Sequence, residues 1–113
     1  MTARIVAPDR IACVVPFCRR TVARVRFPDA AEWICGQHWR LVPASLKQQR
    51  RIVRRRMQKI HRYEARMYTT LGGPNLLDVH RIIRARGSAV RASVAAWDGA
   101  KASAIEAAMG IGA

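Results

Sequence analysis

Three cysteines and one histidine in the first third of this chain are spaced as the ligands of a metal ion. Four residues separate Cys13 from Cys18, two separate Cys35 from His38, and sixteen lie between the pairs. Pairs this close let the backbone curl around an ion so that both side chains reach it, and structural zinc takes four such ligands in a tetrahedron. The spacing predicts one structural Zn²⁺ held by Cys13, Cys18, Cys35 and His38.

Three other interpretations of these residues stay open. The cysteines could be small buried apolar residues beside a surface histidine. A Cys13–Cys18 disulfide would leave Cys35 without a partner, and an odd cysteine count disfavours a disulfide framework. A catalytic zinc usually has three protein ligands and an open position, whereas four ligands favour a closed structural site. The sequence alone does not decide between zinc and iron in the cell.

A second group of side chains with evident chemistry is basic. Residues 47–66 hold nine of the chain's 21 Lys and Arg residues and a single acid, Glu64. On a helix, five of these cations step by four, four, three and four residues along one face. Guanidinium groups donate forked hydrogen bonds to phosphate and stay charged at any biological pH. The predicted nucleic-acid-binding residues are Arg50, Arg51, Arg54, Arg55, Lys59, Arg62 and Arg66, extended by Arg19, Arg20, Arg24 and Arg26.

The composition agrees with a polyanionic partner. The 113 residues form one small domain with a formal net charge of +14, which attracts nucleic acid, an anionic membrane surface or an acidic protein. An arginine-rich composition, or a solvated charged face, would give the same total. Clustering of the cations favours a functional role, so we predict a protein that binds DNA or RNA mainly through the phosphate backbone.

Catalysis is not expected from this sequence. The two further histidines, His61 and His80, lie among basic residues, and the seven acidic residues are scattered. A nuclease would need a general base or a second metal with carboxylates nearby. The alternative to nucleic-acid binding is a protein-binding adaptor or inhibitor. It would dock on an acidic or nucleic-acid-binding surface of a host complex, in anti-defence or transcription regulation, or serve as a minor virion component.

Short elements must bring the metal ligands together. Residues 1–10 are predicted to be a flexible N-terminus and 11–43 a zinc-binding hairpin module. Within this module the alternating residues 21–27 favour a strand that pairs with a returning strand at 32–35. Residues 36–41 suit one helical turn. Trp33, Trp39 and Trp97 are expected in the core rather than stacked on bases.

Two helical segments are predicted after the metal-binding module. The first, a basic amphipathic helix over 44–71, has an apolar stripe, and Gly72-Gly73-Pro74 ends it. The second covers 75–109, is capped by Asn75 and is interrupted by a loop near Gly99. The stripes consist of Leu46, Val53, Met57, Ile60 and Met67 on the first, and Leu76, Val79, Ile83, Val90, Val94 and Trp97 on the second.

The fold class predicted from these elements is small α+β: a zinc-bound β-hairpin followed by an antiparallel helical hairpin. The alanine-rich stretch 89–108 could also support close helix contacts in a homodimer. Neither a signal peptide nor an apolar run long enough to span a bilayer is visible, so a cytoplasmic protein without a membrane partner is expected.

The metal-binding segment resembles known modules. A Cys-x4-Cys knuckle, a hairpin and a Cys-x2-His pair at the start of a helix are similar to treble-clef and zinc-ribbon folds. More narrowly, residues 13–44, with Trp33-Ile34-Cys35-Gly36-Gln37-His38-Trp39-Arg40-Leu41-Val42-Pro43, resemble small zinc-finger proteins common in bacteriophage genomes. The resemblance covers about a third of the chain and implies a metal and a phage setting. Such modules bind DNA, RNA or proteins, so it implies no single function.

Overall fold

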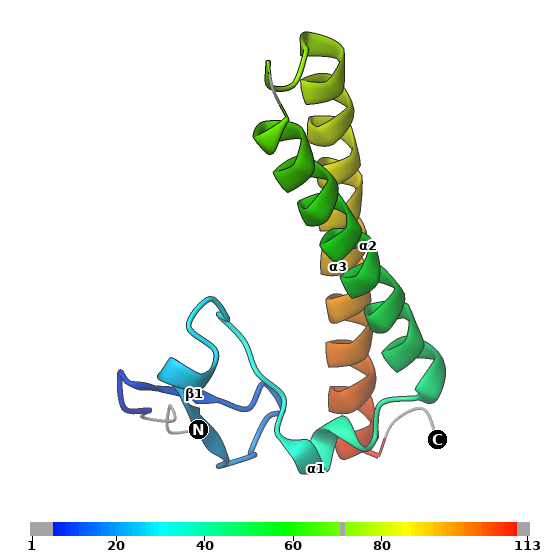
Figure 1. The fold of residues 1–113 in the computed structure, drawn as a ribbon. Coiled ribbons are helices and arrows are strands. Elements are labelled where there is room, and N and C mark those ends of the chain that lie inside the picture. Colours follow the sequence, from blue (N-terminus) through cyan, green and yellow to red (C-terminus); the bar gives the residue numbers. More distant parts are fainter. Residues whose placement is uncertain (1–5, 71, 111–113) are drawn as a thin grey trace. The chain divides into compact units, whose positions relative to one another are not determined.

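The computed structural model describes residues 6–70 and 72–110 and has a small α+β fold (Figure 1). A two-stranded antiparallel hairpin precedes two long helices that pack together. The elements are β1 (Arg10–Ala12), β2 (Thr21–Ala23), a 3-10 turn η1 (Arg24–Arg26), α1 (Gly36–Trp39), α2 (Ala44–Thr69) and α3 (Leu76–Ala108). The chain forms two compact units. A metal-binding unit comprises 1–43 and 100–113, and a helical unit comprises 44–99.

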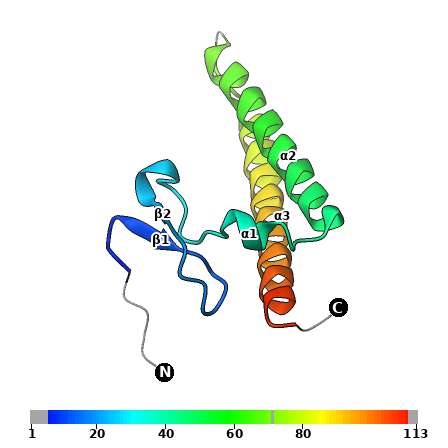
Figure 2. The ribbon, with the colours of Figure 1, turned by 90° about the horizontal axis from the view of Figure 1, so that it is seen from below.

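The β-hairpin differs from the predicted one. β1 pairs with β2 (Figure 2). Ile11 lies opposite Val22, and both of these side chains are buried. The prediction that 21–27 pairs with 32–35 is wrong. Residues 32–35 form no named strand, and Trp33 makes only an isolated parallel bridge with Cys13. The hairpin therefore encloses the first pair of metal ligands instead of connecting the two pairs.

The hairpin ends at Arg24. The N–H of Arg24 donates to the carbonyl of Asp9 at 2.8 Å, and the carbonyl of Arg24 accepts the N–H of Phe27 at 3.1 Å. The chain thus turns into η1 at this residue. Val25 is consequently 83% exposed rather than packed on a sheet face.

The predicted flexible segment 1–10 overlaps this hairpin. Residues 1–5 lie outside the described part of the chain. Arg10, in contrast, belongs to β1, and its guanidinium donates from Nε to the hydroxyl of Thr21 at 2.6 Å. The side chain of Arg24 donates to the carbonyl of Pro8 at 3.2 Å. Residues 8–10 are thus tied to β2 and η1.

α2 and α3 lie side by side as an antiparallel hairpin (Figures 1 and 2). The connection uses positive φ at both Gly72 and Gly73, a conformation open to glycine because it has no β-carbon. Asn75 caps α3 as predicted, since its Oδ1 accepts the N–H of Asp78 at 2.8 Å. Sequence patterning therefore located this turn and its cap correctly.

The buried stripe of α3 is lined by small residues, which corrects the predicted stripe. Ile82, Ala89 and Ala96 are buried in the helical unit, whereas Ile83 and Val94 are more than half exposed. The alanines leave room beside α3 for the longer side chains of α2. The predicted stripe residues Leu76 and Val90 are also exposed, and Val79 and Trp97 are half-buried.

α3 continues without a break through Gly87 and Gly99, so the predicted loop near Gly99 is wrong. A glycine inside a helix costs about 1 kcal/mol relative to alanine. At Gly99 the helix is packed, because a β-carbon there would lie 3.7 Å from Cδ2 of Leu46. Tertiary packing outweighs the local propensity. Among the described residues, no helix combines the length and the apolarity that crossing a bilayer requires.

Candidate metal centre and basic surface

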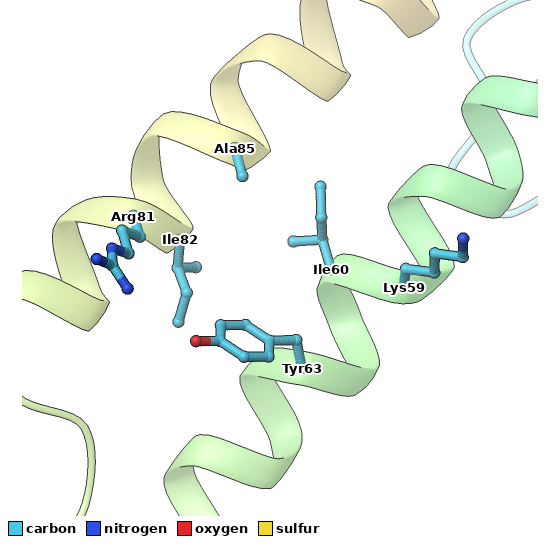
Figure 3. Close-up of a pocket in the computed structure, with 6 residues that line it drawn as sticks. All are labelled: Lys59, Ile60, Tyr63, Arg81, Ile82 and Ala85. Atoms are coloured by element: carbon cyan, nitrogen blue, oxygen red, sulfur yellow. The ribbon is translucent and has the colours of Figure 1, made fainter.

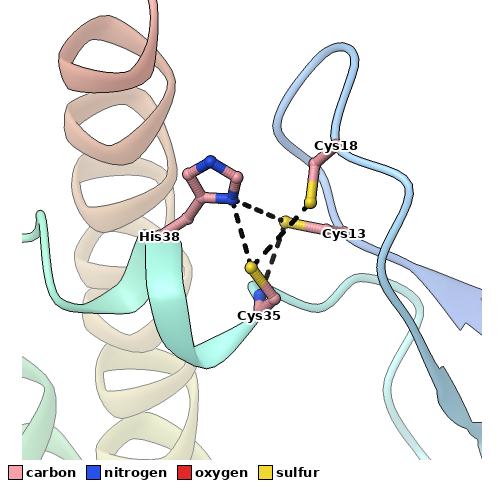
Figure 4. A group of neighbouring side chains, drawn as sticks. All are labelled: Cys13, Cys18, Cys35 and His38. Atoms are coloured by element: carbon pink, nitrogen blue, oxygen red, sulfur yellow. Dashed lines mark hydrogen bonds between the residues drawn. The ribbon is translucent and has the colours of Figure 1, made fainter.

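The four predicted ligands come together at one point in the metal-binding unit (Figure 4). Cys13 follows β1 directly, and Cys18 closes a turn in which its N–H donates to the carbonyl of Val15 at 3.2 Å. Cys35 precedes α1, and His38 lies one helical turn further on. The knuckle thus contributes two of the candidate ligands, and the N-cap and the body of α1 contribute one each.

The distances between the donor atoms suit a tetrahedral zinc ion. The donor atoms of the four residues all lie within 4.8 Å of one another. Sγ of Cys18 is 3.9 Å from Sγ of Cys35, and Nδ1 of His38 is 3.7 Å from Sγ of Cys13 and 3.1 Å from Sγ of Cys35. Zinc–sulfur bonds of about 2.3 Å in a tetrahedron place ligand sulfurs about 3.8 Å apart. The site is therefore compatible with one bound zinc ion.

Backbone hydrogen bonds fix the ligands in this arrangement. The N–H of Cys13 donates to the carbonyl of Arg20 at 3.0 Å, and the N–H of Val14 donates to that of Trp33 at 2.9 Å. The second of these bonds holds the chain before Cys35 against the knuckle. The N–H of Cys35 also donates to Sγ of Cys13 at 3.4 Å, a contact that stabilises a metal-bound thiolate.

The thiols are buried and differ in proton affinity. All three cysteines are buried and none forms a disulfide. Burial raises the pKa of Cys13. Burial also acts to raise the pKa of Cys18, but hydrogen bonds from Arg20 and from the other two thiols bring it below its ordinary value. A bound zinc ion would hold all three side chains as thiolates, because the thiolate is the form of cysteine that binds metal.

The predicted basic ridge lies on the outer face of α2. Each of its five members is exposed: Arg51, Arg55, Lys59, Arg62 and Arg66. The one acid of α2, Glu64, forms an ion pair with Arg86 of α3. Neither ion pair that the structure gives within 6–70 and 72–110 involves a ridge cation. Within the described part of the chain, these two ion pairs therefore leave the positive charge of the five ridge cations uncompensated.

Arg50 and Arg54 lie beside this ridge. The guanidinium of Arg50 sits over the ring of Trp97 at 5.0 Å from its centroid. Burial lowers the pKa of Arg50, and the positive charge of Arg54 lowers it further. Arg54 itself is exposed. Arg50 thus contributes to packing between the two helices. Trp97, like Trp33 and Trp39, is half-buried, so the core position predicted for the three tryptophans is reached only in part.

The four arginines predicted on the metal-binding unit have different environments. Arg24 is hydrogen-bonded to the carbonyls of Pro8 and Arg10, so it braces the hairpin. Arg26 lies 5.9 Å from the ring centroid of Phe27. Arg19 and Arg20 are exposed beside Cys18. Of the four arginines, Arg19 and Arg20 are therefore the two that lie next to a predicted metal ligand.

One residue with an unusual environment was not predicted. Phe17 is 77% exposed and has a φ of 67°, in the left-handed region. The sequence held a signal, because Pro16 favours the second position of a turn whose third position usually requires glycine. In place of glycine this chain has an aromatic residue.

Comparison with protein-family models, with curated proteins and with solved structures finds no match to this chain. His61 and His80, the histidines outside the metal cluster, are both exposed. Within 6–70 and 72–110, the four ligands form the one group of three or more Cys, His, Asp or Glu side chains able to hold a metal ion. The site is therefore a cluster of three cysteine side chains and one imidazole that is compatible with one bound metal ion.

Proposed function

We propose that this chain is a zinc-stabilised nucleic-acid-binding protein that contacts the phosphate backbone through the outer ridge of α2. In this proposal the metal-binding unit is a treble-clef-like module whose zinc ion is structural, since four protein ligands leave no open coordination position. A phage setting stays a prediction from the sequence.

The observation that supports this proposal is the row of five exposed cations on α2, none of which takes part in the ion pairs of the described residues. The five cations from Arg51 to Arg66 span about 22 Å, since each helical residue rises about 1.5 Å. One nucleic-acid strand presents about six phosphates over that length, at roughly 3.4 Å each. Pairing of Glu64 with Arg86 removes the one acid of α2 from competition for the ridge cations. The ridge thus matches a phosphate row in sign, length and density.

Salt titration with paired variants tests the proposal. Five phosphate contacts predict a slope of about −4 to −5 in a plot of log affinity against log salt for a duplex. The double variant Arg55→Gln/Arg62→Gln should flatten the slope by about 2 and weaken binding about tenfold or more at low salt. Fluorescence anisotropy of a labelled duplex at several salt concentrations measures both quantities.

A matched control removes the same charge from the other helix. Arg84 and Arg91 are exposed on α3, and Arg84→Gln/Arg91→Gln should leave the slope nearly unchanged. Charge-preserving Arg55→Lys/Arg62→Lys should keep most of the affinity. An equal loss of slope in both glutamine variants would show that binding is diffuse and not centred on α2. No binding at low salt would rule out the proposal.

A further inference from the structure

A groove beside the metal centre combines an aromatic ring with two cations. Its volume is about 640 Å³, and its lining includes Phe17, Arg19, Arg20, His38 and Met109, all from the metal-binding unit. None of the described residues that line it is acidic. The volume lies in the range of small-ligand sites. The groove thus offers a flat apolar surface together with anion-binding groups.

The conformation of Phe17 points to a function for its ring. Residues 15–18 form a turn closed by the N–H of Cys18 and the carbonyl of Val15, with Pro16 at the second position. Phe17 takes the third position at φ 67°, where glycine is preferred and a bulky residue is strained. The ring gains little burial in return, because the residue is 77% exposed. Neither local preference nor packing explains a phenylalanine here.

We infer that Phe17 is a stacking platform for an unpaired base, and that Arg19 and Arg20 bind the flanking phosphates. Aromatic side chains bind single strands in this way, because every base has a face that can stack. Arg19 and Arg20, the two residues that follow this turn, provide the charge complement. The inference rests on the proposed function and deepens it: the metal-binding unit takes single-stranded nucleic acid, and α2 supplies backbone contacts.

Abasic strands separate stacking from phosphate binding. The probes are a labelled single strand of about 12 nucleotides of mixed sequence and an abasic strand of equal length, with the same phosphates. The unaltered protein should bind the base-containing strand about tenfold more tightly. Phe17→Leu, which keeps an apolar side chain but no ring, should bind the two strands equally. Phe17→Trp should keep the preference.

Two variants control for structural effects. Phe27→Leu removes the chain's other phenylalanine ring, which belongs to the same unit and is 41% exposed beside Arg26, and should keep the preference. Phe17→Gly relieves the strained φ, so it should be at least as thermally stable as the unaltered protein while losing the preference. Arg19→Gln/Arg20→Gln should weaken binding of both strands by the same factor.

The outcomes distinguish this inference from the proposed function. Equal binding of both strands by the unaltered protein, or a preference that survives in Phe17→Leu, would overturn the stacking platform and leave backbone binding by α2 intact. A preference lost equally in Phe27→Leu would also overturn it. Absence of binding to duplex and to both single strands at low salt would overturn the proposed function together with the inference.

Discussion

Cys35 and His38 lie one helical turn apart because Cys35 precedes the first turn of α1. The N–H of Trp39 donates to the carbonyl of Cys35 at 2.8 Å, which closes the turn that aims both side chains at the same point. The cysteine pair needs no helix, because the turn at residues 15–18 folds the knuckle back on itself. The chemistry of the centre thus depends on two local turns and a few hydrogen bonds.

Replacement of the histidine ligand tests this centre at the residue scale. His38→Ala should weaken zinc binding by more than about 100-fold, since loss of a supporting contact alone already costs 10–100-fold. His38→Cys should keep one zinc per chain, because four thiolates also form a structural zinc site. Metal analysis, with competition by a chromophoric chelator, measures both effects.

His61→Ala provides the matched control for that measurement. His61 lies on α2, outside the metal cluster, so its removal should leave one tightly bound zinc. Equal zinc content in His38→Ala and in His61→Ala would contradict the four-ligand centre.

At the scale of elements, the helical hairpin is held by contacts that are mostly half-buried. No residue of α2 is fully buried, and α3 meets it largely with alanines. A shallow pocket of about 280 Å³ opens between the helices, where Ile60 and Tyr63 face Ile82 and Ala85 (Figure 3). The side chain at residue 85 is too small to cover these apolar walls. The packing of the hairpin can therefore be improved at this position.

The same substitution at two alanines of α3 should have opposite effects. Ala85→Leu fills the pocket and should raise the free energy of unfolding by about 1 kcal/mol. Ala89 is fully buried, so Ala89→Leu overpacks the interface and should lower that energy by about 1–3 kcal/mol. Chemical denaturation followed by far-ultraviolet circular dichroism measures both. Stabilisation by both substitutions would mean that the helices do not pack at Ala89.

Sequence reasoning predicted some of these elements and missed others for physical reasons. The Cys and His spacing and the Gly72-Gly73 turn are local signals, and both were read correctly. The stripe of α3 was misassigned, because Ile83 and Val90 look more like core residues than Ala89 does. The face of a helix that becomes buried depends on its partner helix. Long side chains on one helix leave room only for small side chains on the facing helix. The strand pairing was missed because β2 pairs with β1, which begins in the segment predicted to be flexible, and not with residues 32–35.

For the molecule as a whole, the metal and most of the charge belong to different units. The helical unit carries 13 basic and three acidic side chains, for +10 of the formal +14, and no metal ligand. The metal-binding unit holds all four ligands. Within the metal-binding unit, an ion pair between Lys101 and Glu32, at 3.1 Å, connects the last turns of α3 to the segment before Cys35. The candidate metal site and the basic helix that is proposed to bind phosphate thus belong to different units of the chain.

Removal of zinc should therefore act unequally along the sequence. Chelation should abolish protection from hydrogen exchange over 10–42, because the small hairpin and α1 have little core besides the ligands. Protection over 46–69 should fall much less, since α2 has its partner within the helical unit. Hydrogen exchange with mass spectrometry resolves the two segments. Loss of protection in both segments at the same chelator concentration would show that the metal holds the entire chain together.

The tryptophans are divided between the two units as well. Trp33 and Trp39 belong to the metal-binding unit, and Trp97 lies under the guanidinium of Arg50 in the other. A Trp97→Phe protein emits only from the neighbourhood of the ligands, and a Trp33→Phe/Trp39→Phe protein only from the helical hairpin. Indole fluorescence thus gives each half of the molecule its own optical reporter, without any attached dye.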